Sequence, residues 1–171
     1  MTGYLQVYTG NGKGKTTAAI GLTIRAAGAG LKVFFIQFLK KGDYSEIKAL
    51  SKFSDQIIIE QYGMGKFVKG SPSQEDILAG QQGLARIKAV MAENKYDLMV
   101  IDEGNIAVKY GLFPIQEFLA VIDKKPPRLE IIITGRWAAM ELMEKADLVT
   151  EMKELKHYYH RGVPARIGIE K

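Results

Sequence analysis

Short apolar runs alternate along the chain with longer segments whose apolar residues recur at helical spacing. Five runs rich in Val, Ile and Phe predict buried strands because they are continuous and only about four to six residues long. They are Leu5–Thr9, Lys32–Gln37, Gln56–Glu60, Leu98–Ile101 and Glu130–Thr134. Two weaker runs, Leu148–Met152 and Ala165–Ile169, are expected to add edge strands.

Amphipathic helices are predicted between these runs. The first covers about Lys15 to Ala27, the next starts at the capping-box sequence Ser73-Gln74-Glu75-Asp76, a third starts at Pro114 and a short one covers Trp137–Lys145. Buried strands that alternate with helices indicate an α/β fold of three layers, with a mostly parallel central sheet covered on both faces. In such sheets, ligands bind beyond the carboxyl ends of the strands.

The length and composition are those of one globular domain spanning residues 1–171. The chain has no cysteine, which excludes disulfides, thiolate metal sites and a cysteine nucleophile. No stretch reaches the ~18–20 apolar residues of a membrane span, and the N-terminus lacks a signal-like pattern, so a cytoplasmic protein is expected.

The net charge of +5 raises the question of nucleic acid as a partner. The basic excess lies in residues 1–70, which hold ten Lys or Arg and four Asp or Glu. No aromatic-interleaved basic stripe and no zinc, KH or RRM signature accompanies it. A basic pocket for a small anionic ligand is therefore expected, and no nucleic acid.

A glycine–lysine loop directly follows the first predicted strand and precedes a helix. Such a loop resembles a P-loop, in which backbone N–H groups and a helix N-terminus bind phosphate. We expect Lys15 to reach a phosphate oxygen and the Thr16 hydroxyl to bind Mg²⁺. Because Thr9 replaces the usual first glycine and Lys13 adds a cation, the loop suits a whole triphosphate at least as well as a terminal phosphoryl group. The expected ATP-binding residues here are Thr9, Gly10, Asn11, Gly12, Lys13, Gly14, Lys15, Thr16 and Thr17.

Two acids, Asp102 and Glu103, end the fourth predicted strand, as in a Walker B motif. We expect Asp102 to hold Mg²⁺, directly or through water, and Glu103 to act as a base toward water or to bind a ligand hydroxyl. These residues predict nucleotide binding and leave the reaction open. A RecA-like P-loop ATPase or kinase acting on the γ-phosphate, and a regulatory nucleotide-binding module without turnover, are both compatible with them.

Taken in order, the motifs resemble the P-loop type of ATP:corrinoid adenosyltransferase (the cob(I)alamin and cob(I)yrinic acid a,c-diamide adenosyltransferase family). The resemblance covers nearly the whole chain. It rests on Val7–Ala19, Ile36–Lys40, Asp102-Glu103, Tyr110–Leu112, Thr134–Arg136, Ala146–Met152, Lys156-His157 and Gly168–Glu170.

The resemblance implies an RecA-like fold, Mg²⁺ and a homodimer. It also implies transfer of the 5′-deoxyadenosyl group of ATP to the Co(I) of a corrinoid, with release of triphosphate. Co(I) attacks the ribose C5′, so no protein base is required, and Lys13 and Lys15 stabilise the leaving triphosphate. On this reading Glu103 and Asn105 orient ATP or Mg²⁺, and Arg25 and Arg136 contact ATP.

The segment Tyr62–Lys69 lies where the family places aromatic residues beneath the corrin ring, so Tyr62 and Phe67 are candidates for corrinoid binding. Trp137 is a third candidate, although it is more readily interpreted as a core residue. Gly104 stands where a bulky aliphatic residue is common. The chain begins close to its first predicted strand, whereas many members have an N-terminal helical extension that closes the site.

The remaining charged residues suggest surface roles. Lys40, Lys41, Lys66 and Lys69 are expected to be solvated, with docking of an acidic, flavodoxin-like electron donor as the alternative. The two histidines, His157 and His160, are not expected to form a metal site.

Overall fold

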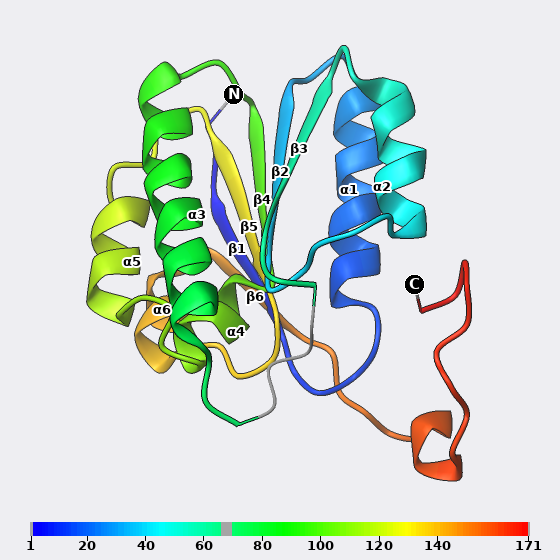
Figure 1. The fold of residues 1–171 in the computed structure, drawn as a ribbon. Helices are drawn as coiled ribbons and strands as arrows, with labels where there is room; N and C mark the ends of the chain where they lie inside the picture. Colours follow the sequence, from blue (N-terminus) through cyan, green and yellow to red (C-terminus); the bar gives the residue numbers. More distant parts are fainter. Residues whose placement is uncertain (1, 66–69, 171) are drawn as a thin grey trace.

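The computed structural model describes residues 2–65 and 70–170 and contains a six-stranded, all-parallel sheet (Figure 1). The strands lie in the order β3-β2-β4-β5-β1-β6. Their bounds are β1 Leu5–Thr9, β2 Val33–Phe38, β3 Ile57–Tyr62, β4 Leu98–Asp102, β5 Glu130–Thr134 and β6 Leu148–Glu151. The prediction of a parallel α/β sheet is confirmed.

Helices cover both faces of the sheet (Figure 1). Alternate residues of a strand point to opposite faces, so the central strands β2, β4 and β5 contribute buried residues to two apolar cores. One core packs the sheet against α3, α5 and α6 and contains Phe34, Phe38 and Phe118. The other packs the sheet against α1 and α2 and contains Phe35 and Leu50. The helices are α1 Lys15–Gly28, α2 Ser45–Leu50, α3 Gln74–Glu93, α4 Gly104–Lys109, α5 Ile115–Ile122 and α6 Met140–Lys145, with 3₁₀ turns at Ser51–Phe53 and Tyr158–Arg161.

The predicted capping box is present at the start of α3. The Ser73 hydroxyl accepts from the Asp76 N–H, and the Asp76 carboxylate accepts from the Ser73 N–H. Both contacts satisfy backbone donors that the first helical turn leaves unpaired.

Two predicted elements differ from the structure. The segment 165–169 forms turns rather than an edge strand, because β6 ends at Glu151 and the following chain leaves the sheet. The helix predicted from Trp137 begins only at Met140, since Gly135 and Trp137 both have positive φ angles and Ala138 N–H donates to the Thr9 hydroxyl.

Most of the candidate residues lie at the carboxyl edge of the sheet, at the bottom of Figure 1, because all strands run in one direction. Strand β1 leads into the glycine–lysine loop (residues 9–17), and β4 ends at Asp102. Beyond β6 the chain crosses back toward the start of α1, so its last residues lie beside that loop (Figure 1). Within the described residues, no helix combines the length and apolarity needed to cross a bilayer.

Candidate active site

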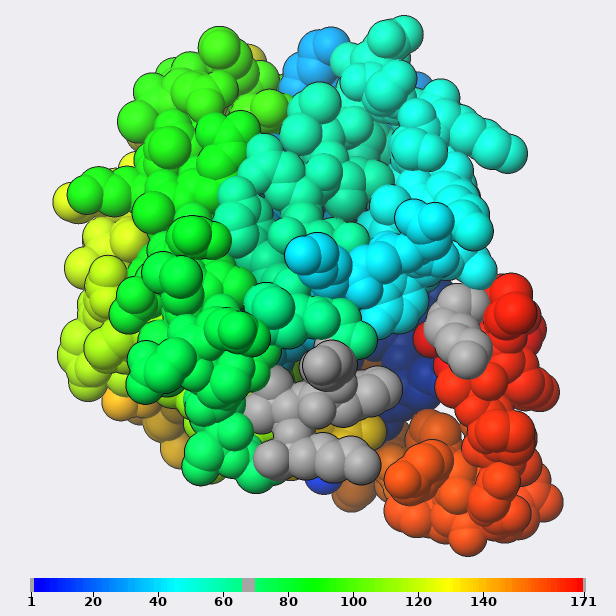
Figure 2. Space-filling model, in the orientation of Figure 1, coloured from blue at the N-terminus to red at the C-terminus, as the bar shows by residue number. Residues whose placement is uncertain are grey.

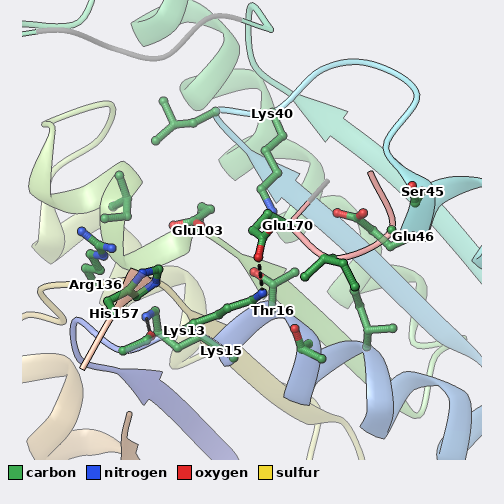
Figure 3. Close-up of a pocket in the computed structure, with 18 of the residues that line it drawn as sticks. Lys13, Lys15, Thr16, Lys40, Ser45, Glu46, Glu103, Arg136, His157 and Glu170 are labelled. Atoms are coloured by element: carbon green, nitrogen blue, oxygen red, sulfur yellow. Dashed lines mark hydrogen bonds and ion pairs between the residues drawn. The ribbon is translucent and has the colours of Figure 1, made fainter. Parts of the chain in front are cut away.

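A cavity of about 820 Å³ opens at the carboxyl edge of the sheet. In Figure 2 the dark blue of the loop and the start of α1 is visible at the bottom of a recess between the cyan α2 region and the red C-terminal segment. Figure 3 shows Glu103, Arg136 and His157 on one side of this cavity and Ser45 and Glu46 on the other. The cavity is large enough for a nucleotide and part of a second substrate.

The amino-terminal end of α1 faces this cavity. Gly14, at φ +120°, turns the chain into the helix, no side chain caps the first turn, and no acidic residue lies there. The unpaired N–H groups and the helix dipole are therefore available to an anion. Residues Gly12 to Thr17 line the cavity as predicted for a phosphate-binding loop.

Lys15 folds back into its own loop. Its Nζ donates to the carbonyl oxygens of Gly10 and Gly12 at 2.7 and 2.6 Å, and the residue is 9% exposed. Burial, followed by the charge of Arg136, lowers the pKa of Lys15. The two carbonyl groups hold the ammonium at the wall of the cavity, where it can also reach a bound anion.

The first three residues of the loop lie on its other side. Thr9, Gly10 and Asn11 line a separate cavity of about 430 Å³ and are not among the residues lining the larger one. The Met152 N–H donates to the Thr9 carbonyl at 2.9 Å, and the Gly12 N–H donates to the Met152 carbonyl at 2.7 Å. These bonds fix the shape of the loop. Thr9, Gly10 and Asn11 therefore contribute to the site by holding the loop in place, and direct contact between these three residues and ATP stays a prediction.

The substitution Gly10→Ala tests whether the loop is fixed in this shape. Gly10 has a φ of +94°, and an added Cβ would lie 2.5 Å from the Met152 carbonyl oxygen. Gly10→Ala is therefore expected to lower the free energy of unfolding by about 2 kcal/mol, through strain and a clash with backbone. Thermal unfolding measures the loss. Gly28→Ala is the matched control, because a Cβ at Gly28 meets nothing within 4 Å. Equal stability of the two variants would contradict the fixed loop.

Asp102 is completely buried and is not among the residues that line the cavity, but it bonds Thr16 and Lys40, which do line it. Its Oδ1 accepts from the hydroxyls of Thr16 at 2.8 Å and Thr134 at 2.6 Å. Its Oδ2 accepts from Gln37 Nε2 at 3.1 Å and Lys40 Nζ at 2.9 Å. Burial acts to raise the pKa of Asp102, but the Lys40 charge and these hydrogen bonds hold it below its ordinary value. Asp102 is thus a carboxylate.

The donor set of Thr16 and Asp102 fits a hard cation. A hydroxyl and a carboxylate oxygen lie 2.8 Å apart beside the phosphate-binding turn. Oxygen ligands of this kind, completed by water and phosphate, are those that Mg²⁺ prefers.

Glu103 directly follows Asp102 and immediately precedes α4, with a left-handed φ of 58°. Its N–H donates to the Thr134 hydroxyl, and its side chain lines the cavity. Within the described part of the chain, no hydrogen bond engages its carboxylate. Burial and the charge of Asp102 raise the pKa of Glu103.

The other residues predicted to contact ATP are dispersed. Arg136 lines the cavity. Asn105 does not: it is 1% exposed, and its Nδ2 donates to the carbonyls of Gly135 and Tyr8, which links β5 to β1. Arg25 lies in the last turn of α1, exposed and away from the cavity-lining residues.

The three corrinoid candidates have different positions. The core interpretation of Trp137 is wrong: the indole is 48% exposed and lines the cavity, since the left-handed φ of 57° turns it outward. Tyr62 ends β3, packs against the apolar core and donates to Glu60 at 2.9 Å rather than lining the cavity. Phe67, with Lys66 and Lys69, falls outside the described residues.

Close packing explains why a glycine, Gly104, stands where a bulky aliphatic residue is common. A Cβ there would lie 2.9 Å from Ile101 Cγ2 and 3.0 Å from Ile133 Cγ2. The start of α4 therefore packs directly on two strands, which leaves no room for a larger residue.

The C-terminal segment forms one wall of the cavity, which the sequence analysis did not foresee. His157, Gly168, Ile169 and Glu170 line it. Lys13 Nζ donates to Glu170 at 2.7 Å and to the Tyr158 hydroxyl at 2.9 Å, as the dashed line in Figure 3 shows for Glu170. Hydrogen bonds from Arg166, then from Lys13 and Tyr158, hold the pKa of Glu170 far below its usual range. Among the residues that the structure describes, no group of three or more His, Cys, Asp or Glu is placed to hold a metal ion.

The prediction that Lys40 is a solvated surface residue is also wrong. Its side chain is 20% exposed and ion-paired with Asp102. Although burial acts to lower the pKa of Lys40, the Asp102 carboxylate raises it above its ordinary value. The available signal was positional: Lys40 lies two residues beyond β2, just as Asp102 and Glu103 lie at the end of β4.

Unfavourable backbone conformations are concentrated at the cavity. Of four non-glycine residues with positive φ among those the structure describes, Leu39, Glu103 and Trp137 line it, and Asn94 caps α3. Such conformations cost about 1–3 kcal/mol each and are typical of functional sites.

Comparison with known proteins supports one family. The family model described as "ATP:corrinoid adenosyltransferase BtuR/CobO/CobP" matches residues 1–170. The corrinoid adenosyltransferase of Pseudomonas aeruginosa is 34% identical over 169 residues, covering 98% of this chain and 83% of the relative. Those of Escherichia coli K12 and Salmonella typhimurium are 33% and 31% identical over 175 residues, each covering 98% of this chain and 85% of the relative.

Proposed function

Because the chain belongs to the ATP:corrinoid adenosyltransferase family, we propose that it transfers the 5′-deoxyadenosyl group of ATP to the Co(I) of a corrinoid and releases triphosphate. The observation that carries the proposal is the placement of cations. Lys13, Lys15, Lys40 and Arg136 all line one cavity at the uncapped amino-terminal end of α1. This suits a ligand with several negative charges, as a triphosphate has.

The reaction forms a Co–C5′ bond and breaks the C5′–O5′ bond of ATP. The electron pair of Co(I) makes the new bond, and the electrons of the broken bond leave on the triphosphate. The main task of the protein is therefore to stabilise a leaving group. Lys15 and the N–H groups of the first turn of α1 lie where they can bind the developing charge, which accelerates the reaction only if they bind the transition state more tightly than ATP.

Thr16 and Asp102 are the residues that would hold Mg²⁺. The ion would supply charge neutralisation for the triphosphate oxygens. Asp102 is suited to this because Gln37, Thr16 and Thr134 fix both of its oxygens. Lys13 is suited to the outermost phosphate, since it lies at the exposed rim and has an acidic partner, Glu170, that an incoming anion would replace.

Product analysis tests the proposal. The full-length protein is incubated without oxygen with ATP and chemically reduced cobalamin, and both substrates are followed by chromatography. Adenosylcobalamin and inorganic triphosphate in equal amounts are expected. ADP and phosphate would instead support the γ-phosphate chemistry of an ATPase or kinase, and binding without any product would support a regulatory module.

Glu103→Gln separates these chemistries. For adenosyl transfer, the substitution is expected to reduce kcat by about tenfold without abolishing it, because Co(I) needs no general base and Glu103 only orients ATP or Mg²⁺. Steady-state rates of adenosylcobalamin formation measure the effect. Complete loss of turnover with unchanged ATP affinity would show that Glu103 acts as a base.

Trp137 provides an optical test of where the corrinoid binds. It is the only tryptophan, so its fluorescence reports on one position at the cavity. Binding of cobalamin, which absorbs the emitted light, is expected to quench most of this emission, and Trp137→Phe should raise the KM for the corrinoid by about tenfold through loss of stacking area. An unquenched signal at saturating cobalamin would place the corrinoid elsewhere.

The proposed function also implies protein partners. The family resemblance favours a cytoplasmic homodimer whose cobalt is reduced by an acidic, flavodoxin-like protein. Lys41, which is exposed and next in sequence to the cavity-lining Lys40, suits such docking. Light scattering tests the dimer. If Lys41→Glu and added salt leave the rate of flavodoxin-dependent reduction unchanged, docking at this position fails.

A further inference from the structure

Lys40 and Asp102 form a buried ion pair inside the proposed metal site. Lys40 Nζ lies 2.9 Å from Asp102 Oδ2, and the two side chains are 20% and 0% exposed. The other oxygen, Oδ1, accepts from the Thr16 and Thr134 hydroxyls. Asp102 therefore already has a cation on one oxygen and hydroxyl donors on the other.

This arrangement sets up a competition. The proposed function assigns Asp102 to Mg²⁺, and Lys40 supplies a positive charge to the same carboxylate. Two cations on one carboxylate repel each other strongly in a buried site, where the effective dielectric constant is low. Arrival of Mg²⁺ at Asp102 must therefore weaken or break the contact with Lys40.

The position of Lys40 limits where its ammonium can go. Leu39, with φ +59°, turns the chain just beyond β2, so Lys40 reaches the cavity from the side opposite the loop residues Lys13 and Lys15. Figure 3 shows its side chain extending into the cavity toward Thr16. A lysine has a flexible stem of four methylene groups, so an ammonium released from Asp102 stays within the same cavity as the triphosphate.

We propose that Lys40 is a positioning residue of the metal–triphosphate site: it neutralises Asp102 until Mg²⁺ arrives and then binds a triphosphate oxygen. The inference rests on the proposed function. It adds a third lysine to the site and explains how a fully buried carboxylate is retained without metal. A buried carboxylate whose only cationic partner has been removed is strongly destabilising.

The first test uses Mg²⁺ alone, without nucleotide. Thermal unfolding is measured over a Mg²⁺ titration for the wild type, Lys40→Met and the control Lys41→Met, whose lysine is exposed and next in sequence. Without Mg²⁺, Lys40→Met is expected to unfold about 10 °C below the wild type, because Asp102 loses its cation. Mg²⁺ should restore most of this loss, with half-saturation at a concentration about tenfold lower than for the wild type. Lys41→Met should behave as the wild type.

The second test uses inorganic triphosphate at saturating Mg²⁺, with calorimetry as the readout. Lys40→Met is expected to bind it about tenfold more weakly than the wild type, and Lys40→Arg should keep most of the affinity because it keeps the charge. The double variant Lys40→Met/Asp102→Asn should regain thermal stability and lose the response to Mg²⁺. If Lys40→Met alone does not fold, the double variant still tests whether the unpaired Asp102 carboxylate is the cause.

The outcomes separate the inference from the proposed function. If Lys40→Met has the Mg²⁺ response of the wild type, or binds triphosphate as tightly, the inference is overturned and the proposed site stands. If the wild type itself binds no Mg²⁺–triphosphate, the proposed site fails and the inference fails with it.

Discussion

Lys15→Ala is expected to lower kcat/KM for adenosyl transfer by about a thousandfold or more, which makes turnover undetectable in ordinary assays. Lys15 Nζ is held by the carbonyls of Gly10 and Gly12 beside the uncapped first turn of α1, so it is the cation best placed to meet the leaving triphosphate. Adenosylcobalamin formation under anaerobic conditions measures the loss.

The control for this prediction is Lys88→Ala, since Lys88 is exposed on α3, a helix whose residues do not line the cavity. It should retain full activity. Calorimetry adds a second readout, because Lys15→Ala should also bind inorganic triphosphate much more weakly than the wild type. Full turnover by Lys15→Ala would exclude the loop from the reaction.

Asp102→Asn is expected to remove activity and to cost about 3 kcal/mol of stability. The new amide carries no charge and has one accepting oxygen, whereas both oxygens of Asp102 accept hydrogen bonds in the structure. Lys40 would then lie buried without an anion. Denaturant unfolding gives the stability change, and a titration with Mg²⁺ gives the loss of metal response.

Asp43→Asn is the matched control, because Asp43 is exposed in the loop before α2. Its stability and Mg²⁺ response should equal those of the wild type. An Asp102→Asn variant as stable as this control would contradict a charged, ion-paired Asp102.

The strands β2 to β5 could be predicted from sequence because each contains at least three consecutive apolar residues. The bounds of β1 and β5 agree with the predicted ranges, and β2 and β3 start one residue later than predicted. The segment 165–169 also contains apolar residues, but Arg166 and Gly168 interrupt them, and it forms turns in which Ile167 is 82% exposed. A segment of five residues is too short for its hydrophobic pattern to distinguish a strand from a turn. Only hydrogen bonding to the sheet could have stabilised a strand here.

The short helices α2 and α4 were not predicted, for a related reason. Each has six residues and no side-chain cap. α4 starts at a glycine that follows a residue of left-handed conformation, so its stability comes from packing on β4 and β5 rather than from helix propensity. Local sequence carries little information on such contacts.

The site could be predicted where functional side chains directly follow a strand in the sequence. The loop residues Gly12–Thr17 and the acid Glu103 line the cavity as expected, and Asp102 bonds Thr16. Contacts over long sequence distances were not predictable. Lys40 and Asp102 are 62 positions apart, and Lys13 and Glu170 are 157 apart. The position of Lys40 just beyond β2 places it at the carboxyl edge of the sheet, but it does not identify Asp102 as its partner, and no local pattern distinguishes Glu170 from solvated surface.

The bond that breaks in ATP is the central claim, and an isotope label locates it. ATP carrying ¹⁸O at the 5′ bridging oxygen is incubated anaerobically with the protein and reduced cobalamin, and the products are analysed by mass spectrometry. Adenosyl transfer breaks the C5′–O5′ bond, so the ¹⁸O is expected in inorganic triphosphate, with none in a nucleotide product. Recovery of the label in ADP or AMP would mean that a phosphorus–oxygen bond had broken, and would contradict the proposed function.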